Sequence, residues 1–402
     1  MVTSSPHRLL DAALIGSLTL ISIGGGLFIP LSLVFFVELT DIPLPILGLI
    51  ISAAGLTSLP VPIVAGRLAD RFGARTFVIV ALALQSAAFL GFSVAREPLA
   101  VLTVSIVMAL GSRLYWSTIF AALADYSETS GTQSRWFAIA NIARTAGIAV
   151  GGLLTGLALT DPSAERYVTL ALAAAGCLAG SAFLMALTPT RVRRPVFESA
   201  APALLAPLRN RPFVALLLVN TVFACSTMLL GLALPTVVAV GLRGPGALTA
   251  ALLVGNAILI AALGLAGARW ASRRNALRVL AASAAIWAVG CAFLSVAAGW
   301  GTLGPATAAL VLAVAFFSLA EIIHAPTSLN LASGLAPPAE RGTYLALFQY
   351  SFVIAEIVLP ALFAGLFTVH HSAPFVLLVA LNLAMIPALV GISRLKEVVA
   401  SP

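Results

Sequence analysis

Long apolar stretches recur along the whole of this 402-residue chain, and they constrain its fold more than any other feature. A helix of about 20 apolar residues is roughly 30 Å long, which is the thickness of the hydrocarbon core of a bilayer. Twelve such stretches are expected to form membrane-spanning helices, over residues 9–37, 45–66, 76–95, 99–123, 136–159, 167–188, 213–240, 247–268, 277–298, 304–333, 343–368 and 374–393. The sequence therefore predicts an all-α membrane protein.

The composition leaves no room for a water-soluble domain. Hydrophobic residues make up 61% of the chain and charged residues only 9%, which excludes an ordinary soluble protein. The first stretch follows Arg8 and is longer than the core of a signal peptide, so we expect it to stay as the first helix. Cys177, Cys225 and Cys291 all lie inside apolar stretches. We therefore expect no disulfide framework, no metal site and no bound cofactor.

The basic residues follow a pattern that fixes an expected orientation. If the N-terminus is cytoplasmic, 17 of the 22 basic residues fall on the cytoplasmic side and only Arg96, Arg166 and Arg243 on the other; Arg113 and Arg144 lie within stretches. This positive-inside bias explains the basic pI without a nucleic-acid partner. Only one basic residue is lysine, which is typical of a GC-rich bacterial genome. We expect a multi-pass protein of the bacterial cytoplasmic (inner) membrane with both termini in the cytoplasm.

The chain reads as two copies of one six-helix pattern. The connection at 189–212 is rich in arginine and proline and lies near the midpoint, so we expect a bundle at 1–188, a cytoplasmic linker at 189–212 and a second bundle at 213–402. Three pairs of segments match at offsets of about 202 to 206: Gly26–Pro30 with Gly231–Pro235, Gly66–Arg75 with Ala268–Asn275, and Arg135 with Arg341. Repeats at a constant offset indicate duplication. A parallel repeat of six helices is a transporter architecture.

One loop carries a resemblance to a known family. The segment Gly66–Arg75, Gly-Arg-Leu-Ala-Asp-Arg-Phe-Gly-Ala-Arg, resembles the signature of the major facilitator superfamily through Gly66, Leu68, Asp70, Arg71, Gly73 and Arg75. The resemblance implies two pseudo-symmetric six-helix bundles. It also implies a conformational latch in this loop, formed by Gly66, Asp70, Arg71, Gly73 and Arg75. The glycines allow a tight turn, and Asp70 can pair with an arginine or face the positive end of a helix.

Further motifs resemble the drug/proton antiporter branch of that superfamily. They are Phe28–Leu31, Ala336–Tyr344, and the glycines Gly147, Gly151 and Gly152. Ile148 stands where the antiporter motif has proline, and Ser105 stands where the branch has an arginine. The branch implies proton-coupled export of small amphipathic organic compounds, as in multidrug or antibiotic efflux.

Five ionisable residues are expected deep in the bilayer, where burying a charge costs several kcal/mol and charged residues usually have a function. They are Arg113, Arg144, Glu321, His324 and Glu356. We take them as candidates for substrate or proton binding, with Glu321 and Glu356 as the proton carriers. The resemblance implies that the first, fourth, seventh and tenth helices line the cavity. In the alternative interpretation, the arginines and glutamates form fixed structural ion pairs.

Two other functions stay open from the sequence. The same scaffold can import or facilitate a small metabolite, and a membrane-embedded lipid-modifying enzyme is a different class. Such an enzyme would need His, Asp or Cys clustered at one membrane face, whereas the four histidines here are scattered. No Gly-x-x-x-x-Gly-Lys-Ser/Thr phosphate loop is present, so an ion gradient is the expected energy source. We therefore expect a monomeric transporter that is not an enzyme, with a small-molecule substrate, protons and the lipid bilayer as its partners.

Overall fold

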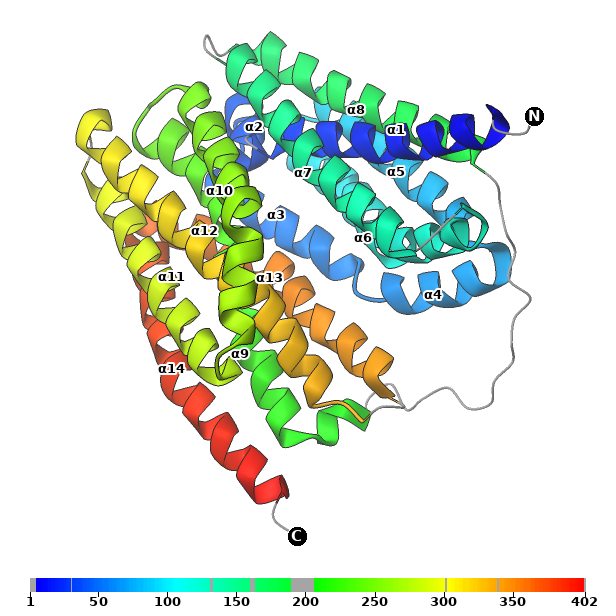
Figure 1. The fold of residues 1–402 in the computed structure, drawn as a ribbon. Helices are drawn as coiled ribbons and strands as arrows, with labels where there is room; N and C mark the ends of the chain where they lie inside the picture. The colour runs from blue at the N-terminus through cyan, green and yellow to red at the C-terminus, as the bar shows by residue number, and fades with distance from the viewer. Residues whose placement is uncertain are drawn as a thin grey trace. The chain divides into compact units, whose positions relative to one another are not determined.

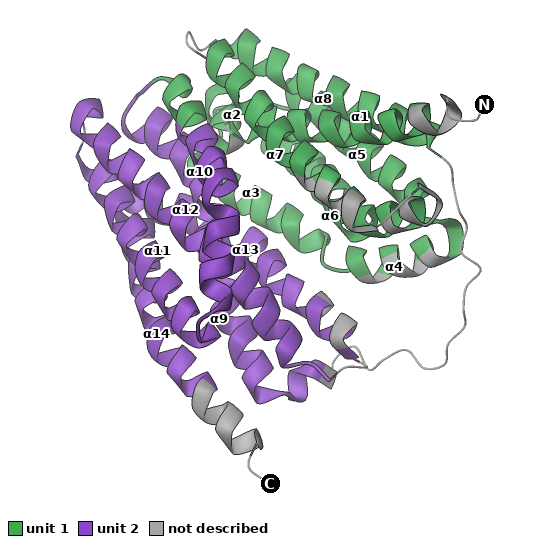
Figure 2. Ribbon diagram, in the orientation of Figure 1, with its two compact units in different colours: residues 1–197, 245–251 green, residues 198–244, 252–402 purple. Residues whose placement is uncertain are grey.

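The computed structural model of the chain describes residues 5–29, 31–130, 133–159, 163–188, 206–300, 302–337 and 340–400, and every regular element in these ranges is helical. The helices form two compact units (Figure 1 and Figure 2). Unit 1 comprises residues 1–197 and 245–251, and unit 2 comprises residues 198–244 and 252–402.

In unit 1, α1 lies between α7 and α8, α5 packs against α6 and α8, and α3 and α4 both lie on α6. The helices of this unit are α1 (Ser5–Phe28), α2 (Ser32–Leu39), α3 (Leu44–Thr57), α4 (Val61–Phe72), α5 (Ala74–Val94), α6 (Pro98–Ser130), α7 (Gln133–Ala158) and α8 (Ala164–Leu187). A hydrophobic cluster that includes Leu18, Val78, Ile119 and Trp136 joins α1, α5, α6, α7 and α8.

In unit 2, α9 packs against α13 and α14, and α11 packs against α12 and α14. The helices are α9 (Arg211–Thr236), α10 (Gly246–Ser272), α11 (Ala276–Gly299), α12 (Leu303–Gly334), α13 (Arg341–Val369) and α14 (Ala373–Ala400), with a short turn η1 (Ala206–Arg209) and a π-helical turn η2 (Val237–Gly241). The start of α10, up to residue 251, belongs to unit 1. The Asn256 side chain of α10 donates a 2.8 Å hydrogen bond to Ser318 of α12.

The two units pair their helices in the same way. The pairs α1–α7, α1–α8, α5–α6 and α5–α8 of unit 1 correspond to α9–α13, α9–α14, α11–α12 and α11–α14 of unit 2. Paired helices of one unit and their counterparts in the other unit correspond in their order along the chain. This shared pairing agrees with the duplication indicated by the sequence repeats.

Prolines divide two stretches that the sequence predicted as single helices. The expected helix over 9–37 consists of α1 and α2, with Pro30 between them in the sequence, and the expected helix over 45–66 consists of α3 and α4, with a turn that ends at Pro60. Proline lacks the N–H that continues a helix and its ring clashes with the preceding turn. In the second half, Pro235 stays inside α9 and the chain then widens into the π-helical turn.

Glycines allow the backbones of α1 and α7 to approach closely. A Cβ atom on Gly147 would lie 2.5 Å from the Ser22 Cβ, and one on Gly26 would lie 2.5 Å from the Ile148 carbonyl oxygen. Thr155 of α7 donates a 2.7 Å hydrogen bond to the Leu27 carbonyl. The glycines of the antiporter-like segment thus form a close helix contact inside unit 1.

The all-α membrane architecture predicted from the sequence is confirmed. Among the described residues, ten helices are long and apolar enough to cross a bilayer, and Leu44–Thr57 and Ile142–Ala158 are shorter apolar helices. Every one of the twelve predicted stretches is occupied by helix. Most of the predicted 189–212 linker lies outside the described residues, so its boundaries stay a prediction.

Candidate functional site

Two aromatic side chains and two arginines lie together on α6 and α7 of unit 1. Arg113, Trp116 and Phe120 follow one another at intervals of three and four residues, so they share one face of α6. The Arg144 guanidinium of α7 lies 5.9 Å from the centre of the Trp116 ring, and the Trp116 and Phe120 ring centres are 6.3 Å apart. We call these four residues the aromatic–arginine face.

Three of the four residues of the aromatic–arginine face are exposed, and Arg113 is half-buried. Trp116 is 44% exposed and Phe120 is 54% exposed, and Arg144 is exposed beside them. Arg144 lies eleven residues past Gln133, or roughly 16 Å along the helix, close to its middle. A guanidinium that faced lipid at this depth would cost several kcal/mol, so such residues face water or polar protein groups. We therefore expect the Arg144 side of this face to meet water or polar groups rather than lipid.

The sequence predicted Arg113 and Arg144 but missed the two rings. The signal was present, because Trp116 and Phe120 fall three and seven residues after Arg113 and so on its side of the helix. The position of the two rings beside Arg144 could not be predicted, because aromatic side chains in an apolar helix are usually buried or face lipid. A guanidinium beside exposed rings is chemically suited to a ligand that has an aromatic part and a polar group.

Two carboxylates of unit 2 lie near the middle of apolar helices. Glu356 is exposed on α13, fifteen residues past Arg341, and Glu321 is half-buried on α12, eighteen residues past Leu303. These positions are roughly 22 Å and 27 Å along their helices. A carboxylate at such depth is a proton-binding candidate, because its charge is costly there and protonation removes it.

His324 lies in the interior of unit 2. It is 2% exposed, and its Nε2 is 2.9 Å from the Asn220 side-chain oxygen. The Asn220 amide in turn donates a 2.6 Å hydrogen bond to the Ser351 hydroxyl. The imidazole also contacts the rings of Trp287 and Phe223, at centroid distances of 4.9 and 5.3 Å. His324 of α12 thus contacts α9 and α13 through a polar chain and α11 through the Trp287 ring, and the sequence revealed neither.

The five predicted deep residues divide by charge between the units. Arg113 and Arg144 belong to unit 1, whereas Glu321, His324 and Glu356 belong to unit 2. The structure places the two arginines on the contacting helices α6 and α7, with Arg144 beside Trp116. Their roles as substrate or proton sites stay predictions.

The predicted latch spans the end of α4, the connecting residue Gly73 and the start of α5. Gly73 has a backbone φ of 86°, which favours glycine and allows the sharp turn between the helices. Arg75 donates from Nε to the Met185 carbonyl at 3.0 Å and from Nη2 to the Ala186 carbonyl, so its positive charge caps the end of α8.

Of the other latch residues, Arg71 has a described side chain. Arg71 is exposed, with its guanidinium 5.2 Å from the centre of the Phe72 ring. The side chain of Asp70 and the Gly66 position within α4 lie outside the described side chains. The latch therefore stays a prediction.

Tyr126 and Asp11 join α6 to the start of α1. The Tyr126 hydroxyl donates a 2.6 Å hydrogen bond to the Asp11 carboxylate, and its ring lies edge-on to Trp136 of α7. Burial raises the pKa of Tyr126, and the hydrogen bond and negative charge of Asp11 raise it further. This contact connects three helices at the same end of unit 1.

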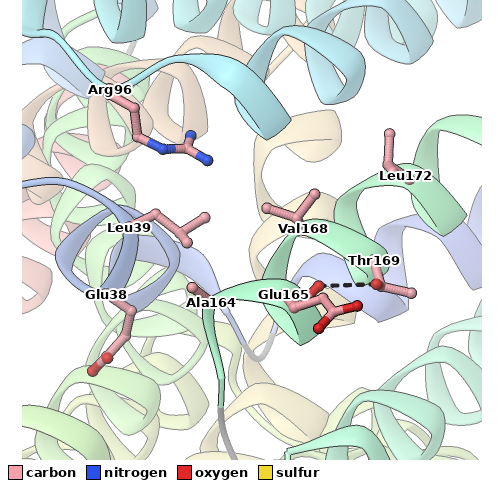
Figure 3. Close-up of a pocket in the computed structure, with 8 residues that line it drawn as sticks. All are labelled: Glu38, Leu39, Arg96, Ala164, Glu165, Val168, Thr169 and Leu172. Carbon is pink, nitrogen blue, oxygen red and sulfur yellow. Dashed lines mark hydrogen bonds between the residues drawn. The ribbon is translucent and has the colours of Figure 1, made fainter.

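A cavity of about 490 Å³ opens at helix ends in unit 1, where α2, the loop after α5 and the start of α8 meet (Figure 3). It is lined by Glu38, Leu39, Arg96, Ala164, Glu165, Val168, Thr169 and Leu172. The Arg96 guanidinium donates 2.9 Å hydrogen bonds to the Ser93 and Ala95 carbonyls and so caps α5. The cavity contains none of the residues predicted as sites, and it lies at helix ends rather than at mid-helix depth.

The described part of the chain contains no group of three or more His, Cys, Asp or Glu that could hold a metal ion. Cys177, Cys225 and Cys291 are free thiols inside helices.

Comparison with known proteins gives one family match and several relatives. A family profile described as Major Facilitator Superfamily matches residues 14–360. The uncharacterized MFS-type transporter YhjO of Bacillus subtilis (strain 168) is 28% identical over 202 residues, which is 50% of this chain and 49% of that protein. The chain thus matches about half the length of that relative. The multidrug resistance protein MdtH of Edwardsiella ictaluri (strain 93-146) is 25% identical over 335 residues, which is 81% of this chain and 78% of that protein.

Solved structures share the arrangement of helices. The crystal structure of the nucleoside transporter NupG superimposes with a TM-score of 0.79 at 13% sequence identity, and the match covers 96% of this chain and 99% of NupG. At this level of identity the likeness shows a common fold.

Proposed function

This chain belongs to the major facilitator superfamily, and from that membership we propose that it is a proton-coupled secondary transporter that exports small amphipathic organic compounds by alternating access. Its family and its helices make it a multi-pass membrane protein of a transporter family. The substrate class, the direction and the coupling ion are the parts that we propose.

The observation that carries this proposal is the exposure of charged side chains halfway along apolar helices. Arg144 is exposed on α7 in unit 1, and Glu356 is exposed on α13 in unit 2. Charges at this depth are tolerated where they border a water-filled path. A transporter needs such a path in both of its halves, whereas a protein that only anchors in the membrane does not.

The proposal of export is supported by sequence similarity. MdtH, which is named a multidrug resistance protein, aligns with 81% of this chain. The exposed rings of Trp116 and Phe120 agree with compounds that have an apolar part. On this account the chain acts in multidrug or antibiotic efflux.

Proton coupling rests on the two mid-helix carboxylates. Glu321 is the leading candidate and Glu356 the second, because loading and release of a proton at either group removes or restores a charge that the bilayer disfavours. A proton that binds in one conformation and leaves in the other would drive the transport cycle. The competing interpretation is that these glutamates are fixed partners of Arg113 and Arg144 and never titrate.

The same fold also serves other substrates, since the nucleoside transporter NupG shares it. Import or facilitation of a small metabolite is therefore the second candidate function. A lipid-modifying enzyme receives no support, because the family match is to transporters.

The orientation that goes with this proposal follows from the charges. Both termini and the 189–212 segment are placed in the cytoplasm of a bacterium, with the protein a monomer in the inner membrane. In this orientation the α4–α5 loop lies on the cytoplasmic side. Closure of that side would depend on Asp70, with Gly73 and Arg75 shaping the turn.

A drug-susceptibility panel tests the function most broadly. The protein is expressed in a host that lacks its main efflux pumps, and the accumulation of each protective compound is measured inside cells with and without a protonophore. Export predicts lower accumulation that the protonophore abolishes. Higher accumulation in expressing cells would instead identify an importer.

A further inference from the structure

We propose that the aromatic–arginine face binds planar aromatic anions, aromatic carboxylates above all, which makes them preferred substrates of the transporter proposed above. The inference rests on that proposed function and names its substrate class. It concerns Arg113, Trp116 and Phe120 of α6 and Arg144 of α7.

The charge of this face favours anions. Arg113 and Arg144 bring two guanidinium groups to neighbouring helices at mid-helix depth. The nearest described acidic residue on α6 is Asp125, nine residues beyond Trp116, or roughly 14 Å along the axis. The Arg144 guanidinium beside Trp116 repels a cation placed at that ring and attracts an anion.

The guanidinium of Arg144 has N–H groups available for a ligand. It makes no hydrogen bond to any other residue that the structure describes, and its described contact is with the Trp116 ring at 5.9 Å. That distance is near the outer limit of a cation–π contact, so the ring satisfies little of the guanidinium. An exposed guanidinium with free N–H groups binds a carboxylate through two parallel hydrogen bonds.

The rings supply the second part of the recognition. The Trp116 and Phe120 rings are tilted 35° to each other with centres 6.3 Å apart, and both are about half exposed. Tyr115 packs edge-on to Trp116 at 5.4 Å and is itself buried, so it supports that ring from within the unit. A planar aromatic ligand can cover the exposed rings while its carboxylate reaches Arg144.

Binding to the purified full-length protein in lipid nanodiscs tests the inference. Four probes of similar size separate the contributions by calorimetry: 2-naphthoate, 2-naphthamide, decalin-2-carboxylate and (2-naphthyl)trimethylammonium. We expect 2-naphthoate to bind about 10- to 100-fold more tightly than 2-naphthamide, as a charge-assisted hydrogen bond requires. Decalin-2-carboxylate should be weaker by roughly three- to tenfold, because it lacks the ring contact.

Variants assign the preference to individual residues. Arg144→Gln should abolish the preference for naphthoate over naphthamide, and Arg144→Lys should restore part of it. Trp116→Leu should weaken both aromatic probes alike. The matched control is the pair Arg274 and Trp270, whose guanidinium and ring lie 4.1 Å apart at the end of α10. Arg274→Gln and Trp270→Leu should change neither affinity, and melting temperatures confirm that each variant is folded.

Several results would overturn the inference: no binding of naphthoate at millimolar concentration, equal or tighter binding of the ammonium probe, or an intact naphthoate preference in Arg144→Gln. If these occur while the susceptibility panel shows protonophore-sensitive efflux of neutral or cationic compounds, the substrate class is wrong and the proposed function stands. If naphthoate binds as expected but no compound is exported, the site stands and the proposed export is wrong.

Discussion

Single side chains at helix ends stabilise unit 1 through complementary charge. Arg75 donates to the last carbonyls of α8, where the helix dipole is negative. Tyr126 donates to the Asp11 carboxylate near the start of α1. Both contacts join segments that are more than 100 residues apart, so neither partner could be identified from the sequence.

Tyr126→Phe should reveal this contact through its pH dependence. Loss of a hydrogen bond to a carboxylate should lower the free energy of unfolding by about 1.5 to 3 kcal/mol. Because the folded state raises the pKa of Tyr126 above its ordinary value of 10.0, the contribution is complete below about pH 10 and is lost as the pH rises further.

The measurement is a set of melting curves of wild type and variant in detergent from pH 8 to 11. The difference in melting temperature should be constant up to about pH 10 and then narrow. A difference that does not depend on pH over this range would show that the hydroxyl is not held neutral by Asp11.

His324 is the residue for which the structure adds most to the sequence prediction. The sequence placed it in a membrane-spanning helix beside Pro326, and the structure adds Asn220, Ser351 and the surrounding rings. His324 and Asn220 are 104 residues apart in the sequence, so their contact depends on how four helices pack. The local sequence pattern does not predict that packing.

His324→Ala should mainly destabilise the protein. It leaves the Asn220 oxygen without its partner and opens a cavity between two rings, at a cost of about 3 to 5 kcal/mol. His371→Ala is the matched control, because His371 is exposed and stacks on Phe367 at 4.5 Å. Thermal unfolding of both variants checks the expectation. Normal stability with lost transport in His324→Ala would instead make this histidine a functional group.

At the level of helices, glycine positions decide how closely α1 and α7 pack. The sequence identified Gly147 and Gly151 through a motif resemblance, and the structure gives the physical reason, which is the approach of the two backbones. Prolines were visible in the sequence, yet the helices near them differ: α1 ends at Phe28 and α2 begins at Ser32, whereas α9 continues through Pro235. A proline in the local sequence predicts that the helix is disturbed there, but not whether it ends or continues. The outcome depends on which backbone groups find hydrogen-bond partners in the surrounding helices.

Gly151→Ala should disrupt the α1–α7 contact. The added methyl group would overlap the backbone of Ile23 and Leu27, which cannot move aside as a side chain can. We expect a loss of about 1 to 3 kcal/mol in stability. Gly176→Ala on α8 is the control, because a Cβ there meets no atom within 4 Å. Equal melting temperatures for the two variants would contradict the close contact.

At the level of the whole molecule, helix length and repetition carried most of the prediction. Apolar stretches predicted an all-α membrane protein, and the two units repeat the same helix pairing. Candidate sites were predicted less completely. Charge inside an apolar stretch identified Arg113, Arg144, Glu321 and Glu356. The exposed rings next to Arg144 could be recognised only from the structure, because exposure depends on tertiary packing.

The proposed orientation predicts which loops are accessible from outside. Of the 20 basic residues in the loops, in the termini or at the ends of the predicted helices, 17 lie on the side assigned to the cytoplasm. A cysteine at Ser199, in a background without the native cysteines, should react with an impermeant maleimide only after the cells are opened. A cysteine at Ser163, before α8, should react in intact cells. Labelling of the Ser199 position in intact cells would reverse the assigned orientation.

Proton-coupled transport is the central claim, and flux in proteoliposomes tests it most directly. A compound identified by the susceptibility panel is moved either by an imposed pH gradient or by exchange without a gradient, and thermal stability is recorded for each variant. Glu321→Gln should abolish the gradient-driven flux while exchange and stability are retained, because only the titrating group is removed, and Glu356→Gln is the second candidate for this behaviour. Full gradient-driven flux in both variants would contradict the claim. Joint loss of stability and exchange would instead identify a fixed structural ion pair.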